Sequence, residues 1–402
     1  MERNPWRELF PQLSGKDEAF LDSAASSLKP RSVIAAVDHY YNDLSVNIHR
    51  GMYKSSYEAT MLYEEARAKV AAFIGADESE IVFLRGATAA LNLVATSFGL
   101  ARLQAGDEII VSELEHHSSF LPWQAVAAKT GAKLVFVPLD AEKRITVDAF
   151  RSVLTKRTRV VALTYVSNVM GYVTPLCEIV PIARSVGAVV VADAAQAVQH
   201  LTIDVKALDV DFLAFSGHKM LGPTGIGVLY GKSALLAGME PIEYGGEMID
   251  DVAKDRSTWK DAPYKFESGT MPIASAIGLG AAVDLIRSIG IPTIEDHVVR
   301  IRRYAYTQLK KIPGIVIYNP TADTGTIAFN VEGVHPHDAA TFFAEKNVSL
   351  RAGHHCAQLL IRALGIEACL RASFYLYNSY ADCDRLVETA REAVAFFKGV
   401  GF

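Results

Sequence analysis

Cysteine is scarce in this sequence. Four cysteines occur among 402 residues, and they lie far apart, at Cys177, Cys356, Cys369 and Cys383. Such spacing contains no Cys-x-x-Cys motif and does not match the dense disulfide framework of a small secreted domain. The scarcity therefore predicts a protein that keeps its thiols reduced.

Long apolar runs and blocks of like charge are absent as well. No stretch is long enough to span a bilayer, and the first seven residues, MERNPWR, lack the apolar core of a signal peptide. The net charge is -5 and the basic residues are scattered, which excludes the footprint of a nucleic-acid-binding protein. We expect a cytoplasmic protein with neither nucleic acid nor membrane among its partners.

What the chain does contain is a large apolar fraction in a regular arrangement. Half of its residues are hydrophobic, which is enough for a large core and favours two domains over one. Between residues 80 and 231, apolar runs alternate with helix-like intervals such as 118–130 and 175–186, as in a doubly wound, mainly parallel sheet. The runs predict seven strands, at 81–84, 108–111, 134–137, 160–163, 189–191, 212–215 and 227–230.

The pattern changes after about Gly290. Helical spacing over 294–311, 337–346 and 382–398, with a strand at 325–330, predicts a smaller α+β unit completed by the N-terminal residues. Residues 241–270, rich in Gly, Asp and Lys, predict an irregular excursion from the sheet. We therefore expect a large α/β domain over 21–285 and a small α+β domain built from 1–20 and 286–402.

Polar residues follow four of the apolar runs. His116, Asn168, Asp193 and Lys219 each stand beyond the end of a predicted strand. Ligands of open α/β sheets bind at the edge formed by the carboxyl ends of the strands. The four residues therefore indicate a binding site at that edge.

Lys219 is the most informative of the four. It follows an apolar run and lies between Ser216-Gly217-His218 and a glycine-rich segment. It is either an ordinary loop lysine or the Schiff-base lysine of a pyridoxal phosphate (PLP) site, with Ser216 and His218 beside the phosphate. Asp193 ends another apolar run and supplies the carboxylate that a protonated pyridine nitrogen needs. Together the two residues favour PLP.

Two further segments extend this interpretation. Residues 85–90 join a strand to a helix, so that Thr88 and backbone N–H groups can bind a phosphate, although any capped helix has a similar pattern. One imidazole at the next strand end, His116, can lie flat on the cofactor ring, although a histidine there is usually a turn residue. Neither segment predicts a cofactor by itself.

The second unit carries the segment RAGHHCA (351–357). Its cysteine follows an arginine and two imidazoles, which can favour a nucleophilic thiolate; the alternative is a buried cysteine acting as a small hydrophobe. Because consecutive residues seldom point to one centre, we predict no metal site here, nor at His335-Pro336-His337, which is more typical of a turn or a helix start. Arg371, in an apolar context, fits either a substrate carboxylate or an internal salt bridge.

These segments occur in one order that resembles a known family. The strings SGHKMLGPTGIGVLYG, VADAAQ, ELEHHSSFLPWQ, YVSNVMG, RAGHHCA and LRASFYLYN are similar to those of the type II (SufS/CsdA-like) cysteine desulfurases. This group belongs to the PLP-dependent, fold-type I, class V aminotransferase-related enzymes. The resemblance runs from LDSAA at 21–25 to the final helix, and RAGHHCA separates the group from the NifS/IscS-like desulfurases.

The resemblance implies a role for each site residue. Lys219 would be the Schiff-base lysine, with Asp193 on the pyridinium nitrogen, Gln196 at the phenolic oxygen and His116 over the ring. The phosphate would be bound by Thr88, Ser216 and His218, and Thr270 would reach the cofactor of a neighbouring subunit in a homodimer. The substrate carboxylate would be held by Asn168 and Arg371, with Cys356 as sulfur acceptor and Arg351 and the His49-Arg50 pair close by.

The sequence departs from the family pattern at three places. Relatives often read Gly-Thr-Pro-Asn where this chain has Gly269-Thr270-Met271-Pro272, which bears on the contact between subunits. Ala87-Thr88 replaces the commoner Thr-Thr, and the segment Tyr375-Leu376-Tyr377 is bulkier than usual, as if to narrow a channel.

The implied activity is conversion of L-cysteine to L-alanine. The sulfur would remain as a persulfide on Cys356 and pass to a SufE-like or SufU-like acceptor, for iron–sulfur cluster assembly or other sulfur trafficking. A selenocysteine lyase or cysteine sulfinate desulfinase with the same lysine is the alternative. A class V aminotransferase, a kynureninase-like hydrolase and an inert sulfur-relay protein leave RAGHHCA or the retained Lys219 and Asp193 unexplained.

Overall fold

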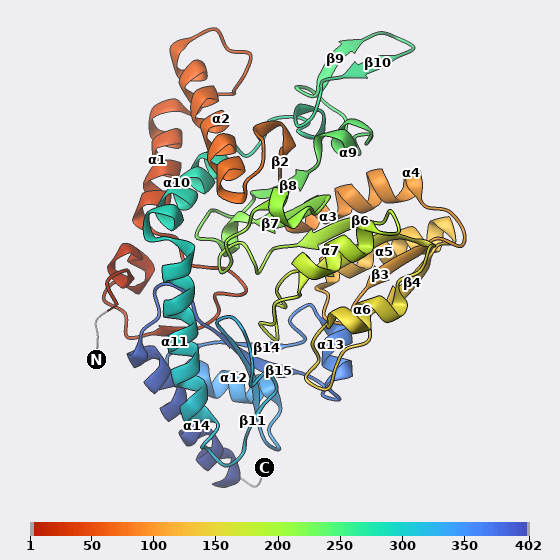
Figure 1. The fold of residues 1–402 in the computed structure, drawn as a ribbon. Helices are drawn as coiled ribbons and strands as arrows, with labels where there is room; N and C mark the ends of the chain where they lie inside the picture. The colour runs from red at the N-terminus through yellow and green to blue at the C-terminus, as the bar shows by residue number, and fades with distance from the viewer. Residues whose placement is uncertain (1–3, 400–402) are drawn as a thin grey trace.

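A seven-stranded sheet forms the centre of the larger part of the chain (Figure 1). The computed structural model describes residues 4–399 and gives the strand order β2-β8-β7-β6-β5-β3-β4. β8 is antiparallel to both of its neighbours, and the other pairings are parallel, which confirms the predicted mainly parallel sheet. The strands are β2 (Ile81–Leu84), β3 (Glu108–Val111), β4 (Lys133–Phe136), β5 (Thr158–Thr164), β6 (Val189–Asp193), β7 (Phe212–Ser216) and β8 (Gly227–Gly231).

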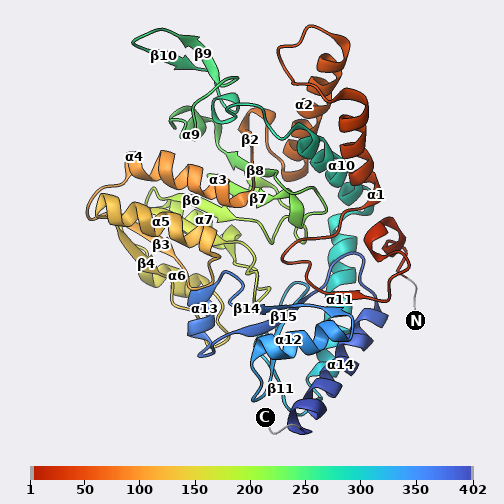
Figure 2. The ribbon, with the colours of Figure 1, turned by 180° about the vertical axis from the view of Figure 1, so that it is seen from behind.

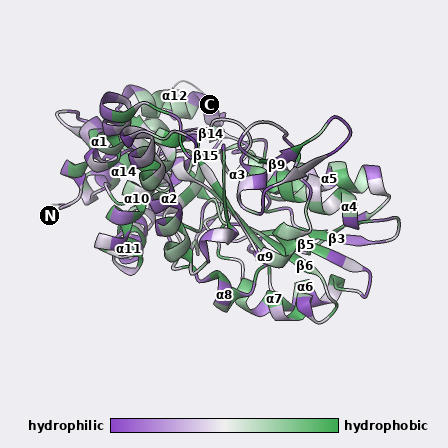
Figure 3. Cartoon of the chain, turned by 90° about the horizontal axis from the view of Figure 1, so that it is seen from above, coloured by the Kyte–Doolittle hydropathy of each residue, from purple (hydrophilic) through white to green (hydrophobic). Residues whose placement is uncertain are grey.

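Helices cover both faces of this sheet, as the two opposite views show (Figures 1 and 2). Alternate residues of one strand enter different cores: Ile109 of β3 packs with α3 (Ala87–Leu93) and α5 (His117–Thr130), and Ile110 packs with α6 (Val147–Val153) and α7 (Leu176–Arg184). Such double burial explains the uninterrupted apolar runs of the sequence. Figure 3 shows the same contrast, with hydrophobic residues along β5 and β6 and hydrophilic ones on outer helices.

The edges of the sheet differ from its centre. β4 is the outermost strand on one side, and its ends, Lys133 and Phe136, are exposed. At the other edge, β2 is covered by α2 (Lys54–Ile74), which packs against α10 (Ile273–Ile289) and through it against α1 (Arg31–His39). The apolar run of β4 is thus a strand, as predicted, but not one buried on both faces.

A second, antiparallel sheet lies in the C-terminal part of the chain. Its strand order is β11-β12-β15-β14, and β1 of the N-terminal segment pairs separately with β13. The strands are β1 (Ala19–Phe20), β11 (Ile315–Ile317), β12 (Thr326–Val331), β13 (Val348–Ser349), β14 (Arg351–Gly353) and β15 (Cys369–Ser373). The helices beside them are α11 (Ile291–Leu309), α12 (Pro336–Glu345), α13 (Gln358–Ala363) and α14 (Tyr380–Gly399).

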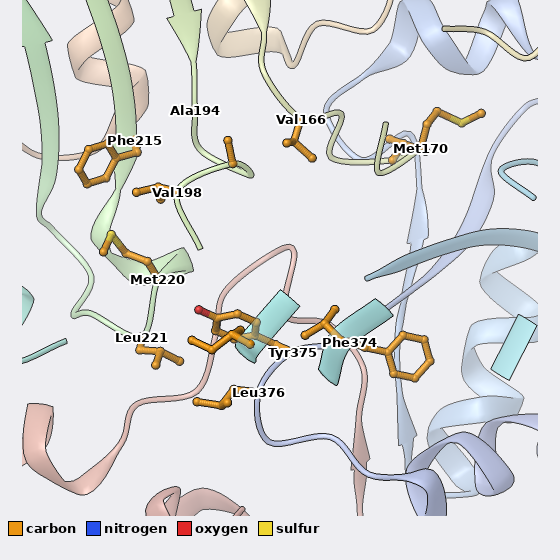
Figure 4. Close-up of a cluster of buried hydrophobic side chains, with 14 of the residues drawn as sticks. Val166, Met170, Ala194, Val198, Phe215, Met220, Leu221, Phe374, Tyr375 and Leu376 are labelled. Carbon is orange, nitrogen blue, oxygen red and sulfur yellow. The ribbon is translucent and has the colours of Figure 1, made fainter. Parts of the chain in front are cut away.

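Apolar side chains join the two sheets. Phe374, Tyr375 and Leu376, which follow β15, belong to the same buried cluster as Phe215 and Met220 from the end of β7 (Figure 4). Continuous packing of this kind fixes one sheet against the other. Residues from both parts of the chain can therefore meet at one site with defined geometry.

The segment 241–270 contains more structure than its composition predicts. A hairpin of β9 (Ile249–Val252) and β10 (Ser257–Trp259) projects from the body of the molecule beside the loop before α2 (Figures 1 and 2). Among residues 4–399, no single helix is long and apolar enough to span a membrane. The helices α10 and α11 meet these criteria only when they are taken as one pair, and that pair is bent by 77°.

Candidate active site

The carboxyl ends of the parallel strands surround one cavity. Its volume is about 200 Å³, and His116, Asn168, Asp193 and Lys219 all line it, as the strand-end pattern predicts. The second sheet contributes Arg371 from β15 and the segment that follows β14. The lining residues are Ala24, Ala25, Ala87, Thr88, His116, Ser118, Thr164, Val166, Asn168, Asp193, Ala195, Gln196, Ser216, His218, Lys219, Arg351, His355, Cys356 and Arg371.

Lys219 and Asp193 form the centre of the cavity. Among residues 4–399, no side chain or carbonyl accepts a hydrogen bond from Lys219 Nζ. Burial lowers the pKa of this amine to about 8, and the negative charge of Asp193 opposes that shift. Asp193 is buried and accepts one hydrogen bond, from the Ala195 N–H at 3.0 Å. The site thus holds an amine that loses its proton near neutral pH, beside a buried carboxyl group with capacity for a further donor.

The turn between β2 and α3 forms one end of the cavity and can bind an anion there. The Ser216 hydroxyl oxygen accepts a hydrogen bond from the Ala87 N–H at 2.9 Å, which leaves the hydroxyl proton free to donate. The close approach depends on glycine, because a Cβ on Gly227 would come within 2.3 Å of the Gly86 Cα. Thr88 lies exposed in the same cavity, so hydroxyl and backbone donors converge there.

His116 caps the N-terminus of α5. Its Nδ1 accepts a hydrogen bond from the Ser118 N–H at 3.2 Å, which leaves Nε2 to carry the ring proton. Burial, helped by the charge of Lys219, lowers the pKa of His116 to about 4. The ring is therefore neutral at physiological pH and offers a flat face and one N–H to the cavity.

Two arginines share one carboxylate beside the cavity. Asp22 accepts from Arg371 Nη2 at 3.3 Å and from Arg351 Nε at 3.2 Å, and Arg371 Nη1 donates to the Asn168 carbonyl at 2.9 Å. The Nε of Arg371 and the Oδ1 of Asn168 are buried without a partner in the part of the chain that the structure describes. The internal salt bridge of Arg371 is therefore present, and its role toward a substrate carboxylate stays a prediction for which Nε supplies a free donor.

Cys356 lies on a conformationally unusual loop. His355 and Cys356 have φ values of +52° and +56°, a left-handed conformation that costs non-glycine residues about 1–3 kcal/mol each. Hydrogen bonds hold the loop: the His117 N–H donates to the Cys356 carbonyl at 2.7 Å, and Asn168 Nδ2 donates to the His355 carbonyl at 2.7 Å. The cysteine itself is exposed, so the alternative of a buried small hydrophobe does not hold for it.

His355 directly precedes Cys356 in the sequence, which suggests that its ring faces the thiol, but the structure places the ring elsewhere. Its ring is buried, and Nε2 donates to the Cys369 carbonyl of β15 at 2.9 Å. Burial, with the charge of Arg371 nearby, lowers the pKa of His355 to about 3, so the ring is neutral. This imidazole anchors the loop and does not supply a charge to the thiol.

The cavity fits the chemical groups of PLP. Asp193 matches a protonated ring nitrogen, Lys219 has the unpaired amine that an aldehyde requires, and Ser216 and Thr88 are donors for a phosphate. Gln196 lines the cavity as well and is fixed by its Nε2, which donates to the Ala24 carbonyl at 2.6 Å. Arg371 also lines the cavity, and its Nε is buried without a partner among the described residues.

Some predicted residues lie elsewhere. Thr270 is exposed and lines a separate cavity of about 220 Å³ together with Arg85. The contact of Thr270 with the cofactor of another subunit therefore stays a prediction. His49 pairs with Glu64 at 3.0 Å, and neither it nor Arg50 lines the Lys219 cavity. Tyr375 and Tyr377 are buried in the core and do not line this cavity, although Tyr375 lines a small separate cavity of about 10 Å³ that also touches Lys219.

Two residues of the site were not predicted from the sequence. Asp22 follows β1 in the LDSAA segment, and its role becomes visible only when two distant arginines converge on it. His117 follows His116 directly, and its contact with the Cys356 loop joins residues more than two hundred positions apart. A second histidine in the sequence EHH was the only signal for it.

Comparison with known proteins agrees with this geometry. Residues 19–386 match the family model described as aminotransferase class-V. A probable cysteine desulfurase of Halalkalibacterium halodurans is 47% identical over 402 residues, covering 99% of each chain.

Solved structures give the same relationship. The cysteine desulfurase CsdA of Escherichia coli superimposes with a TM-score of 0.92 at 43% identity, over 97% of this chain and 98% of that one. The cysteine desulfurase of Thermococcus onnurineus gives 0.94 at 38% identity, over 98% and 99%. The chain therefore belongs to the aminotransferase class-V family and, within it, to the cysteine desulfurases.

Proposed function

We propose that this protein is a PLP-dependent cysteine desulfurase that converts L-cysteine to L-alanine and retains the sulfur as a persulfide on Cys356. The observation that carries the proposal is the meeting of Lys219, Asp193, Arg371 and Cys356 around one cavity. The first two residues suit a cofactor, the third suits an amino-acid carboxylate, and the fourth is a thiol. No single one of them specifies the reaction, but their combination does.

Substrate orientation follows from the arginine. Arg371 is buried and bound on two nitrogens by Asp22 and Asn168, so its direction is fixed and its Nε remains available. A planar guanidinium recognises a carboxylate with defined geometry. The substrate carboxylate would therefore bind beside Asn168, with its side-chain sulfur directed toward Cys356.

Lys219 is the residue that moves a proton. Its pKa of about 8 allows the neutral amine to remove the α-proton of the substrate near physiological pH. When PLP is bound, its ring withdraws the electron pair that this step releases, with Asp193 holding the ring nitrogen protonated. The neutral His116 contributes a ring face and an Nε2 proton to the same cavity.

Sulfur transfer is completed by Cys356. Its sulfur forms a bond with the substrate sulfur as the carbon–sulfur bond of the substrate breaks, and the two electrons end in a new carbon–hydrogen bond. The balance is L-cysteine plus Cys356 thiol giving L-alanine plus Cys356 persulfide. Because Cys356 is exposed as well as lining the cavity, the persulfide is accessible to a second thiol. We propose that a small acceptor protein of the SufE or SufU type takes the sulfur.

The test is turnover of L-cysteine by the purified holoenzyme with a reducing thiol, measuring alanine and sulfide together. Equal amounts are expected from the wild type, and Cys356→Ala should lose at least a hundredfold of both, because no other exposed thiol lines the cavity. Mass spectrometry of the cysteine-treated protein should add one sulfur to the Cys356 peptide.

Cys177→Ala is the matched control, because Cys177 is an exposed cysteine outside the cavity. It should turn over cysteine like the wild type. If Cys356→Ala kept its turnover, sulfur would leave by direct elimination, and selenocysteine or a cysteine sulfinate would become the better substrate.

A homodimer is part of the proposal. Tyr57 and Met61 lie one turn apart in α2, Tyr41, Met52 and Tyr53 precede this helix in the sequence, and all five are exposed by more than half. α2 lies at the same end of the molecule as the β9–β10 hairpin (Figures 1 and 2). Monomers rarely leave large apolar side chains gathered in this way. Thr270 follows the same hairpin, which supports its assignment to the cofactor site of a second subunit.

A further inference from the structure

The Cys356 loop is held by one residue at two points. The His117 N–H donates to the Cys356 carbonyl at 2.7 Å, and the Gln358 N–H donates to His117 Nε2 at 3.2 Å. Between these two bonds lies the end of the left-handed segment of His355 and Cys356. A conformation that is unfavourable for non-glycine residues persists only where surrounding contacts impose it.

The ring of His117 is in the correct state for this contact. Nε2 can accept the Gln358 N–H only when it carries no proton, so the imidazole must be neutral. Burial, together with the nearby His354, lowers the pKa of His117 and favours that state. His117 begins α5 beside the large sheet and Gln358 begins α13, so the bond joins the two parts of the site.

We propose that His117 is a positioning residue that holds the Cys356 loop in its left-handed form and so places the thiol in the cavity of Lys219. The inference rests on the proposed function, because it assigns His117 to the sulfur-transfer step. The backbone bond to Cys356 does not depend on the side chain. The ring supplies the second contact, and its loss would leave the Gln358 N–H to water and the loop free to relax.

The expected kinetic effect is confined to the step that uses the thiol. Arg371 and Asn168 do not contact the ring of His117, so the KM for L-cysteine should stay within about twofold of the wild type. The kcat should fall about tenfold to a hundredfold, because a displacement of about 1 Å in a reacting group costs that much.

The same hydrogen bond can be removed from either partner. His117→Phe keeps a flat ring without an acceptor, whereas His117→Gln keeps an acceptor oxygen at similar reach. Gln358→Pro removes the donor without touching His117, and proline is tolerated at the first position of a helix, which Gln358 occupies in α13. We expect His117→Phe and Gln358→Pro to lose kcat alike and His117→Gln to recover most of it.

A second measurement reports the loop directly, without turnover. Alkylation of the substrate-free holoenzyme by iodoacetamide is followed on the Cys356 peptide, with the exposed Cys177 as internal standard. The ratio of the two rates should change at least threefold in His117→Phe and Gln358→Pro and return toward the wild-type value in His117→Gln. An unchanged ratio or a wild-type kcat in either variant would overturn the proposal, so the test still decides if only one of the two variants folds.

Turnover of L-selenocysteine distinguishes a role of His117 in positioning Cys356 from a role of His117 at the cofactor. Selenium is the better leaving group and is expected to depart without Cys356, so His117→Phe should turn over L-selenocysteine within about twofold of the wild type. Equal losses on both substrates with an unchanged alkylation ratio would place His117 at the cofactor and contradict the inference. If the wild type made no alanine from cysteine, the proposed function would fail, yet the alkylation ratio would still decide the role of His117.

Discussion

At the scale of single residues, the site is controlled by the pKa of one amine. Burial lowers the pKa of Lys219 to about 8, and the charge of Asp193 limits the shift. The same environment holds His116 and His218 at pKa values of about 4, so neither histidine titrates between pH 6 and 9. A pH profile in that range therefore does not report these two histidines, and variants must separate Lys219 from Lys29, whose pKa is also about 8, and from the buried Glu115, whose pKa burial raises to about 7.

Capture of PLP by the cofactor-free protein should follow this titration. Only the neutral amine attacks an aldehyde, so the rate should rise about tenfold per pH unit below pH 8 and level off above it. Asp193→Asn removes the negative charge that raises the pKa, and the midpoint should move down by about one pH unit. Absorbance of the bound cofactor, followed by stopped flow from pH 6 to 10, measures both midpoints.

Lys29 provides the necessary control. Burial lowers its pKa to about 8 too, and its Nζ donates to the His218 carbonyl at 3.0 Å. Lys219→Ala should abolish the absorbance change, whereas Lys29→Met should keep a midpoint near pH 8. A midpoint in Asp193→Asn at or above the wild-type value would contradict the assigned electrostatics.

The sequence reveals residues of the site whose chemical type is itself unusual. A lysine, an aspartate and a histidine after apolar strands are visible without a structure, and all three line the cavity. Asp22 and His117 were not found, because their roles depend on hydrogen bonds across long separations. The anchoring of His355 on β15 was missed for the same reason, since neighbours in the sequence need not face one another.

At the scale of elements, α2 is attached to the edge of the large sheet by a buried ion pair. Arg67 Nη1 lies 2.7 Å from Glu267 Oε1 and also donates to the Ile81 carbonyl of β2 at 2.7 Å. Glu267 accepts in turn from the Phe83 N–H at 2.8 Å. Both charged side chains are at most 3% exposed, so neither can exchange its partner for water.

Arg67→Met should therefore be strongly destabilising. Removing one member of a buried pair leaves the other charge unpaired, which costs about 3–5 kcal/mol in the free energy of unfolding. Arg300→Met is the matched control, because the Arg300 pair with Asp296 is more than half exposed and should contribute less than about 1 kcal/mol. Urea unfolding followed by circular dichroism measures both, and equal losses would contradict the role given to Arg67.

The elements themselves were largely predictable because burial on both faces leaves a clear pattern. All seven strands of the large sheet coincide with apolar runs, and α5, α7, α11, α12 and α14 fall within a few residues of the predicted spans. The β9–β10 hairpin was not predicted, because its exposed side chains leave no alternation to detect. The order of the strands came only from the structure.

At the scale of the whole molecule, the apolar surface at the α2 end bears on the completeness of the site. Thr270 is the one predicted cofactor residue that does not line the Lys219 cavity of its own chain. A second copy seated on the exposed surface around Tyr57 and Met61 would cover that surface and could bring its own Thr270 to the phosphate end. Dimerisation and cofactor affinity should therefore be lost together.

Tyr57→Glu combined with Met61→Glu tests this coupling. Each residue is more than half exposed in the single chain, so folding of the chain should tolerate the change. In a dimer the two glutamates would be buried in the interface, and their unpaired charges would separate the subunits. The mass measured by analytical ultracentrifugation should fall from twice the chain mass to 43.7 kDa, and the PLP dissociation constant should rise at least tenfold. Phe396→Glu, at a similarly exposed site on α14, should alter neither quantity. A monomeric wild type would refute the dimer, and a monomeric variant with unchanged PLP affinity would show that each chain completes its site alone.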